Sequence, residues 1–193
     1  MVISVNKTYE FKNNKYDING YTLSDEEAKK YKNDIIYGQE DYTKWVLCIN
    51  EKEIALTSTG CNTPNYKNII IEKDKLNIIT EYEYFKIDLK SLKCLVNIDL
   101  EDYMTGLTCD LIKYENGFLV ICDFELICID NDKVKWVFDP YNGSGIENIE
   151  IIENDIIKLD VLDAYGLYMY TAYLDKDGKQ QKNTNNQVSV LIF

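Results

Sequence analysis

Three groups of carboxylates are the residues whose type and spacing could do chemistry in this chain. They are Asp99, Glu101 and Asp102; Glu147, Glu150 and Glu153; and Asp160 and Asp163. Two carboxylates held about 5–10 Å apart in a cleft can hydrolyse a glycosidic bond. However, the chain has 33 acidic residues, so close pairs are unavoidable. Solvated strand and loop faces therefore explain these groups better than an active site.

Other catalytic groups are scarce, because the chain has no His and all 21 of its basic residues are Lys. Without His, a Ser or Cys nucleophile lacks its usual base. Without Arg, the chain has no guanidinium group to bind phosphate or carboxylate groups in a bidentate manner. We also find no phosphate-binding glycine loop and no strand-turn-helix nucleophile motif. The sequence therefore predicts a protein that is not an enzyme, with no catalytic residues and no cofactor.

The cysteines and the acidic turns do not have the spacing of metal sites. The six cysteines are Cys48, Cys61, Cys94, Cys109, Cys122 and Cys128. None forms a CxxC pair, so zinc is disfavoured and we expect free thiols in a reducing cytoplasm. Asp175-Lys176-Asp177-Gly178 resembles the start of a calcium loop but lacks the later ligands, and a β-turn explains it better. We predict no metal site.

The net charge of −12 limits the classes of partner. Nucleic acid is disfavoured as a partner, because its binding depends on clustered basic side chains. A basic protein is favoured by long-range attraction, although acidity also serves solubility alone. No apolar run approaches the ~20 residues of a membrane span, and we see no signal peptide. We expect a cytoplasmic protein that does not bind membranes.

Tyrosines beside acidic residues are the best candidates for contacting such a partner. The chain has 16 tyrosines, and those that alternate along a strand, such as Tyr82 with Tyr84 and Tyr168 with Tyr170, are interpreted as sheet packing. Others lie in turn-like segments, where they could anchor a Lys-rich or Arg-rich surface. The predicted partner-binding residues are Asp102, Tyr103, Tyr141, Asp163 and Tyr165.

The N-terminal third of the chain shows two hairpins and one helix. Segments 7–12 and 16–21 read as strands, and Asn19-Gly20 is a turn-like pair. Ser24 with Glu27 forms a capping box, which predicts a helix over about residues 25–36. A second hairpin follows over residues 44–57, and residues 61–66 form a loop.

From residue 67 onward the sequence repeats. Three units each contain an apolar run, a polar turn, a second apolar run, and a third run that ends in an aliphatic residue followed by Asp. The marker residues are Asp88, Asp130 and Asp175, which are 42 and 45 positions apart. Four short strands every ~40–45 residues are typical of β-propeller blades.

Residues 116–138 resemble the quinoprotein (PQQ-like) propeller repeat. An apolar strand is followed by a second strand that ends in Ile129-Asp130, by a short turn, and by Trp136 at the position of the repeat's tryptophan. The other two units carry Cys94 and Gln180 near that position. The resemblance covers about residues 67–183 and implies blade-like units, but it does not imply the quinone cofactor.

The predicted fold is mainly β: a single domain of residues 1–193, with about three to four antiparallel four-stranded blade-like units and one short N-terminal helix. Residues 1–66 supply the N-terminal strands and the helix, and residues 67–183 supply three repeats. Because a ring closes with typically four to eight blades, an open arc is expected. A closed ring and a sandwich with the helix on one side remain alternatives.

These properties favour binding over catalysis. The chain is similar in character to the immunity proteins of bacterial polymorphic toxin systems, which are small, acidic and without catalytic motifs. That similarity implies a cognate toxin domain as the basic partner. One alternative is a carboxylate-dependent carbohydrate-active enzyme. The other is a structural repeat scaffold that self-associates, for example as a homodimer through open sheet edges.

Overall fold

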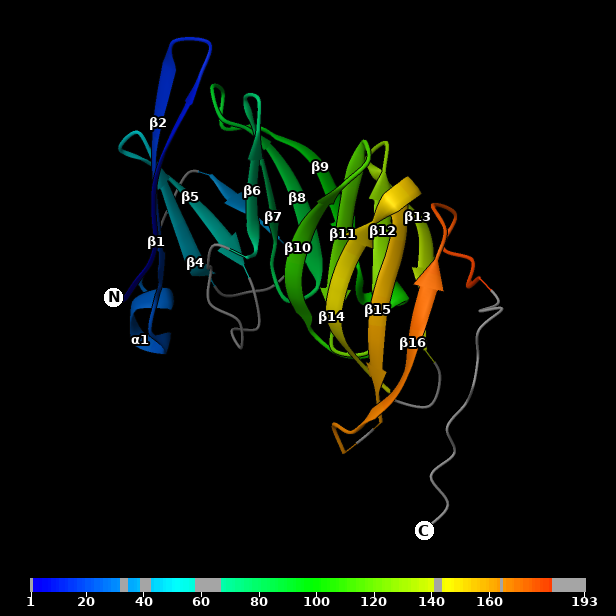
Figure 1. Cartoon of the computed structure of the whole chain (residues 1–193). Helices are drawn as coiled ribbons and strands as arrows, with labels where there is room; N and C mark the ends of the chain where they lie inside the picture. Colours follow the sequence, from blue (N-terminus) through cyan, green and yellow to red (C-terminus); the bar gives the residue numbers. More distant parts are fainter. Residues whose placement is uncertain are drawn as a thin grey trace.

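The chain forms four β-sheets that follow one another both in sequence and in space (Figure 1). The computed structural model describes residues 2–31, 35–38, 43–57, 67–140, 144–163 and 165–181. We call the sheets first to fourth in chain order. In Figure 1 the first sheet, in blue and cyan, and the fourth, in yellow and orange, lie at opposite sides of the molecule.

The first sheet has five strands in the order β1-β2-β4-β5-β3. Its strands are β1 (Val2–Phe11), β2 (Asn14–Thr22), β3 (Ile36–Tyr37), β4 (Thr43–Ile49) and β5 (Lys52–Thr57). The turns Lys12-Asn13 and Asn50-Glu51 have positive φ at both residues, the geometry that suits two-residue hairpins. The hairpin predicted over residues 44–57 is therefore confirmed. The predicted turn at Asn19-Gly20 is wrong, because both residues lie inside β2 and pair with β4.

The helix predicted over residues 25–36 is much shorter in the structure. Helix α1 covers only Asp25–Ala28. Its capping box is present: the Glu27 backbone N–H donates to the Ser24 hydroxyl, and the Glu27 carboxylate accepts from the Ser24 N–H at 2.9 Å. A single turn gains little stability by itself, whereas Ile36 and Tyr37 gain sheet hydrogen bonds as β3, parallel to β5. The capping box thus predicted where the helix begins but not its length.

The second, third and fourth sheets are antiparallel meanders in which each strand pairs with the next in sequence. The second contains β6 (Ile69–Glu72), β7 (Lys75–Ile79), β8 (Glu83–Asp88) and β9 (Cys94–Asp99). The third contains β10 (Thr108–Tyr114), β11 (Gly117–Cys122), β12 (Leu126–Asp130) and β13 (Lys133–Phe138). The fourth contains β14 (Gly145–Ile152), β15 (Ile156–Leu162) and β16 (Tyr168–Leu174). Within the described residues, a single bridge from Leu174 to Gln180 takes the place of a fourth strand in this sheet.

The pairing register corrects one detail of the repeat. Lys86 pairs with Val96 in the second sheet, and Cys128, 42 positions later, pairs with Trp136 in the third. Val96 rather than Cys94 therefore occupies the tryptophan position. The shift arises because residues 89–93 connect β8 to β9, whereas only residues 131–132 connect β12 to β13.

An apolar core lies between each pair of successive sheets. Trp45, Ile78 and Phe85 belong to the core between the first and second sheets. Tyr84 and Phe118 belong to the next core, and buried residues such as Leu126 and Leu159 form the third. These three cores lie between the first and second, the second and third, and the third and fourth sheets, so the four sheets form an open stack. The structure is therefore neither a closed ring nor a two-sheet sandwich (Figure 1).

Trp136 joins the third sheet to the fourth. Its indole N–H donates to the carbonyl of Lys176 at 3.0 Å. The ring lies against Gly178, where an added Cβ would come within 2.5 Å of it.

A backbone hydrogen bond links the second sheet to the third: the Leu111 N–H donates to the Lys67 carbonyl at 2.8 Å.

The meanders place alternate connections at opposite ends of the stack. The lower end in Figure 1 carries the β7–β8, β9–β10, β11–β12, β13–β14 and β15–β16 connections, and the upper end carries the others. The short 3₁₀ helix η1 (Glu101–Tyr103) lies at the lower end, and η2 (Glu153–Asp155) lies at the upper end. Among the described residues, no helix has the length and apolar character needed to cross a membrane.

Candidate partner-binding surface

The predicted partner-binding residues fall at one end of the molecule. Asp102 and Tyr103 lie in η1, and Asp163 and Tyr165 lie in the β15–β16 connection, both at the lower end. Tyr141 lies outside the described residues. These two segments are about sixty positions apart in the sequence. They reach the same end because β9 and β15 both run toward the lower end, and each segment follows one of these strands.

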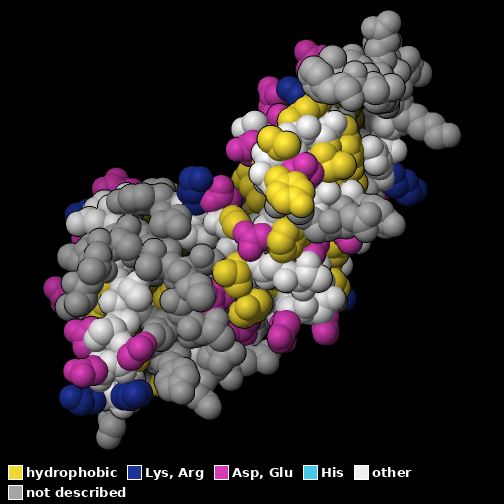
Figure 2. Space-filling model, turned by 90° about the horizontal axis from the view of Figure 1, so that it is seen from below, with side chains coloured by type: hydrophobic (Ala, Val, Ile, Leu, Met, Phe, Trp, Pro, Cys, Tyr) yellow, Lys and Arg dark blue, Asp and Glu magenta, His cyan; other side chains and the backbone are white. Residues whose placement is uncertain are grey.

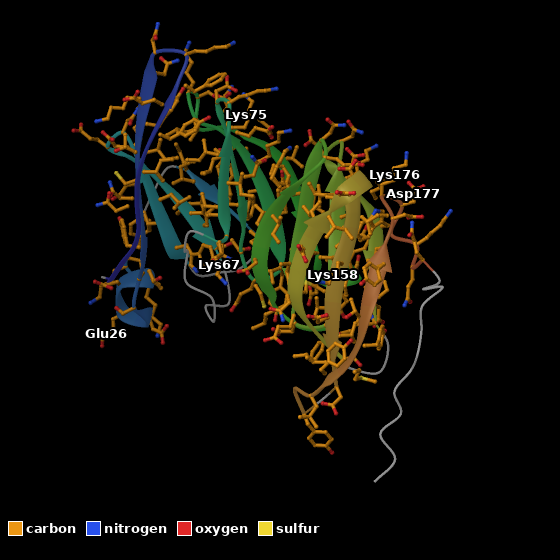
Figure 3. The ribbon with its side chains drawn as sticks, in the orientation of Figure 1. Glu26, Lys67, Lys75, Lys158, Lys176 and Asp177 are labelled. Atoms are coloured by element: carbon orange, nitrogen blue, oxygen red, sulfur yellow. The ribbon has the colours of Figure 1, made fainter. Side chains whose placement is uncertain are left out.

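Charge is distributed unevenly between the two ends. The five lower-end connections contain seven acidic residues and no lysine: Glu81, Glu101, Asp102, Asp123, Glu125, Asp139 and Asp163. The upper-end turns from β6 onward also contain seven acidic residues, but these are accompanied by five lysines: Lys73, Lys90, Lys93, Lys176 and Lys179. Figure 3 shows Lys75 and Lys176 toward the upper end and Lys67, just before β6, lower down. Lys67 is paired with Asp110 at 3.2 Å, so the negative charge of the lower-end connections has little compensation.

Large apolar side chains are exposed on the same end. In the β15–β16 connection and the start of β16, Tyr165 is 90% exposed, Leu167 65%, Tyr168 61% and Met169 52%. Tyr103 in η1 is 42% exposed. Seen from below, hydrophobic side chains form a band with acidic side chains beside it (Figure 2). We call the residues Asp102, Tyr103, Asp163, Tyr165, Leu167, Tyr168 and Met169 the lower-end surface.

Two residues of this surface were missed by the sequence analysis, and one was misinterpreted. Leu167 and Met169 were not singled out, and Tyr168 was assigned to sheet packing on the basis of its alternation with Tyr170. Tyr168 is instead mostly exposed, while Tyr170 is half-buried and donates to the carbonyl of Pro140 at 3.3 Å. The run Leu167-Tyr168-Met169 directly after Gly166 was the available signal, since three successive apolar residues cannot all face one side of a strand.

The β15–β16 connection is held in one shape by Asp163. Its carboxylate accepts from the backbone N–H groups of Tyr165 and Leu167, both at 2.8 Å. Its own N–H donates to the Leu167 carbonyl, and the Gly166 N–H donates to the Asp163 carbonyl. Gly166 has a φ of +77°, which glycine adopts without strain. These hydrogen bonds fix the backbone of Tyr165 and Leu167, the two exposed residues of this connection, relative to Asp163.

A buried glutamate holds the η1 connection in the same way. Glu125, 4% exposed, accepts from both the backbone N–H and the hydroxyl of Thr105, at 2.9 and 2.6 Å. Glu83 occupies the equivalent position in the second sheet, 42 residues earlier, and accepts from the Asn97 amide at 3.0 Å. Both carboxylates are structural acceptors: Glu125 holds the β9–β10 connection, and Glu83 links strand β8 to strand β9.

The carboxylate groups that suggested chemistry have local partners instead. Glu150 pairs with Lys158 at 3.2 Å, and Asp160 accepts from the Thr171 hydroxyl at 2.9 Å. Asp99 accepts from the Glu101 backbone N–H at 2.9 Å. Each of these contacts stabilises a turn or a strand pair, and none of them brings two carboxylates together around an open space.

Two of the described cysteines, Cys109 and Cys128, have thiols with strongly raised pKa values. Burial, together with the carboxylate of Asp123 at 3.2 Å, raises the pKa of Cys109 to about 12. Burial likewise raises the pKa of Cys128 to about 12. Because the thiolate is the reactive form, these two groups are poor nucleophiles and poor metal ligands at neutral pH. In the part of the chain that the structure describes, no three His, Cys, Asp or Glu side chains are grouped so as to hold a metal ion.

Comparison with known proteins adds no relative. The chain matches no protein-family model, and no curated protein is significantly similar to it.

Proposed function

We propose that this chain is a non-catalytic binding protein that recognises a basic partner protein through the lower-end surface. The observation that carries the proposal is the combination of exposed Tyr165, Leu167, Tyr168 and Met169 with connections that contain no lysine. Exposed aromatic and apolar side chains are typical anchors of protein interfaces. The surrounding carboxylates would attract a positively charged surface and disfavour a second acidic copy of this chain.

The most concrete form of the proposal is an immunity protein that neutralises a cognate bacterial toxin domain in the cytoplasm. Such a protein needs only tight binding, in keeping with a chain that lacks His and Arg. The loop fixed by Asp163 supports this form, because a pre-organised surface loses less conformational entropy on binding. The carboxylates provide the charge expected of a protein that covers a basic site.

The test is binding to the product of the adjacent reading frame, purified as its C-terminal domain. We expect a 1:1 complex by calorimetry and sedimentation, with an affinity that falls as salt is raised. Failure to bind that product at low salt, or self-association of this chain through its lower end, would contradict the proposal.

Matched charge reversals locate the binding surface. Asp102→Lys lies on the lower-end surface, and Glu153→Lys lies in η2 at the upper end. Both change the net charge by the same amount. We expect Asp102→Lys to weaken binding about tenfold, and Glu153→Lys to have a much smaller effect. Equal effects would mean that net charge alone, rather than this surface, attracts the partner.

A further inference from the structure

A polar groove of about 400 Å³ opens between the second and third sheets at the upper end. It lies at the opposite end from the lower-end surface. The groove is formed by the β6–β7, β10–β11 and β12–β13 turns and the strands beside them. Its principal side chains are Glu72, Asn77, Tyr84 and Lys86 from the second sheet and Lys113 and Asp132 from the third.

The repeat provides an internal comparison for this groove. Four of the groove residues in the second sheet are Glu72, Asn77, Tyr84 and Lys86. The residues 42 positions later in the third sheet are Tyr114, Leu119, Leu126 and Cys128. In the third sheet all four are buried in the apolar core against the fourth sheet. The equivalent positions thus belong to a mainly apolar core between the third and fourth sheets, and to a polar groove between the second and third sheets. The fold itself does not require polar residues here.

The floor of the groove is polar and held in place. The Tyr84 hydroxyl donates to the Asn77 side-chain oxygen at 2.8 Å, and the Asn77 amide donates to the Ile70 carbonyl at 3.2 Å. Tyr84 is fully buried and Asn77 is 1% exposed. Replacing both partners of such a buried pair by apolar groups of similar shape can be neutral or even stabilising, so the stability of the stack does not require a polar floor.

The walls of the groove carry opposite charges that pair across it. Lys86 of the second sheet pairs with Asp132 of the third at 2.8 Å, and Lys113 of the third pairs with Glu72 of the second at 3.0 Å. Each ammonium has three donor hydrogens, and each carboxylate has two oxygens. Both walls can therefore offer donors and acceptors to a further molecule while the pairs stay formed.

Four lysines and four carboxylates line the groove, although the whole chain is strongly acidic. A balanced lining selects neither cations nor anions by long-range attraction. Interleaved donors and acceptors suit hydroxyl groups, because each hydroxyl both donates and accepts. The volume lies in the range of small-ligand sites. We propose that the groove binds a small, uncharged polyhydroxylated ligand the size of one or two sugar residues.

The test is an amide NMR titration of the full chain with glucose, N-acetylglucosamine and maltose. A ligand of this size is expected to bind with a Kd of about 1 mM. At least one sugar should shift the amides of residues 72–77, 84–86, 113–118 and 131–132 and leave the lower end unchanged. Absence of any shift well above that concentration, or shifts produced by the zwitterion glycine and by none of the sugars, would overturn the proposal.

Two variants tie the binding to this groove. Lys86→Met removes a donor from the groove wall, and its control, Lys133→Met, makes the same change on exposed β13. We expect at least a tenfold loss of affinity for the first and no change for the second. The double variant Asn77→Leu/Tyr84→Leu introduces the residues that the repeat carries at both equivalent positions, Leu119 and Leu126, and removes both partners of the buried hydrogen bond together. It should keep the fold and abolish binding. Binding that survives in both groove variants would place the ligand elsewhere.

Discussion

Asp163 illustrates how a residue can matter to a surface without facing a partner. The sequence placed it among the binding residues because it lies beside Tyr165. In the structure its carboxylate is occupied by the N–H groups of Tyr165 and Leu167. Its contribution is therefore to the position of the aromatic side chains.

The change Asp163→Ala should loosen this loop without unfolding the molecule. Hydrogen bonds to a charged acceptor contribute about 1.5–3 kcal/mol each, so amide exchange at residues 165 and 167 should speed up roughly 10- to 100-fold. The free energy of global unfolding should change little, since the loop is exposed. Asp163→Asn keeps an accepting oxygen and should restore most of the protection. Equal exchange in the Ala and Asn variants would show that the carboxylate does not hold the loop.

At the level of single residues, the sequence singled out some of the exposed side chains of the lower-end surface and not others. Tyr103 and Tyr165 were found because Tyr beside Asp in a turn is a local pattern. Met169 was missed because its exposure depends on an irregularity in the pairing of β16 with β15. The register shifts between Val161 and Leu162, so β16 carries an extra residue there. The apolar run 167–169 indicates a break in alternation, but it does not show which residue is the extra one.

At the level of elements, short-range signals predicted the hairpin over residues 44–57, but they misplaced a turn at Asn19-Gly20 and overestimated the length of the helix. The pairs Lys12-Asn13 and Asn50-Glu51 adopt the positive φ values that hairpins need. Helix α1 ends at Ala28, and Ile36 and Tyr37, which were predicted as its last turn, pair with β5 instead. The groove at Lys86 was also beyond prediction, because it exists only once two sheets are stacked.

The contact between Trp136 and Gly178 can be measured by comparing two glycines. Gly178 and Gly166 have φ values of +72° and +77°, but only Gly178 lies against the indole, while Gly166 has open space around it. Gly166→Ala should cost about 1 kcal/mol, which is the backbone strain alone. Gly178→Ala should cost about 2–4 kcal/mol, because the added methyl group also displaces the ring.

Denaturant unfolding followed by tryptophan fluorescence measures both variants. Trp45 is fully buried in the first core and provides a constant signal. A red shift of the folded-state emission is therefore expected only for Gly178→Ala, as Trp136 becomes more exposed. If the two glycine variants lose the same stability, then Trp136 does not join the third and fourth sheets.

At the level of the whole molecule, we expect the four sheets of the open stack to differ in their local stability. Among the described residues, the second and third sheets have an apolar core on both faces, whereas the fourth has the single core that it shares with the third. The first sheet has an additional small cluster where Leu23 and Ala28 cover Val46. In stacked repeats each unit is stabilised mainly by its neighbours, so the fourth sheet should open first.

Leu159→Ala tests this order directly. Leu159 is fully buried in the third core, and truncation of such a side chain costs about 2–5 kcal/mol. In native-state hydrogen exchange, the amides of β15 and β16 should then exchange much faster while those of β7 and β8 keep their protection. Leu76→Ala, in the core between the first and second sheets, is the matched control and should lower the protection of the whole molecule. An equal loss across all four sheets in Leu159→Ala would mean that the stack unfolds as one cooperative unit despite its open end.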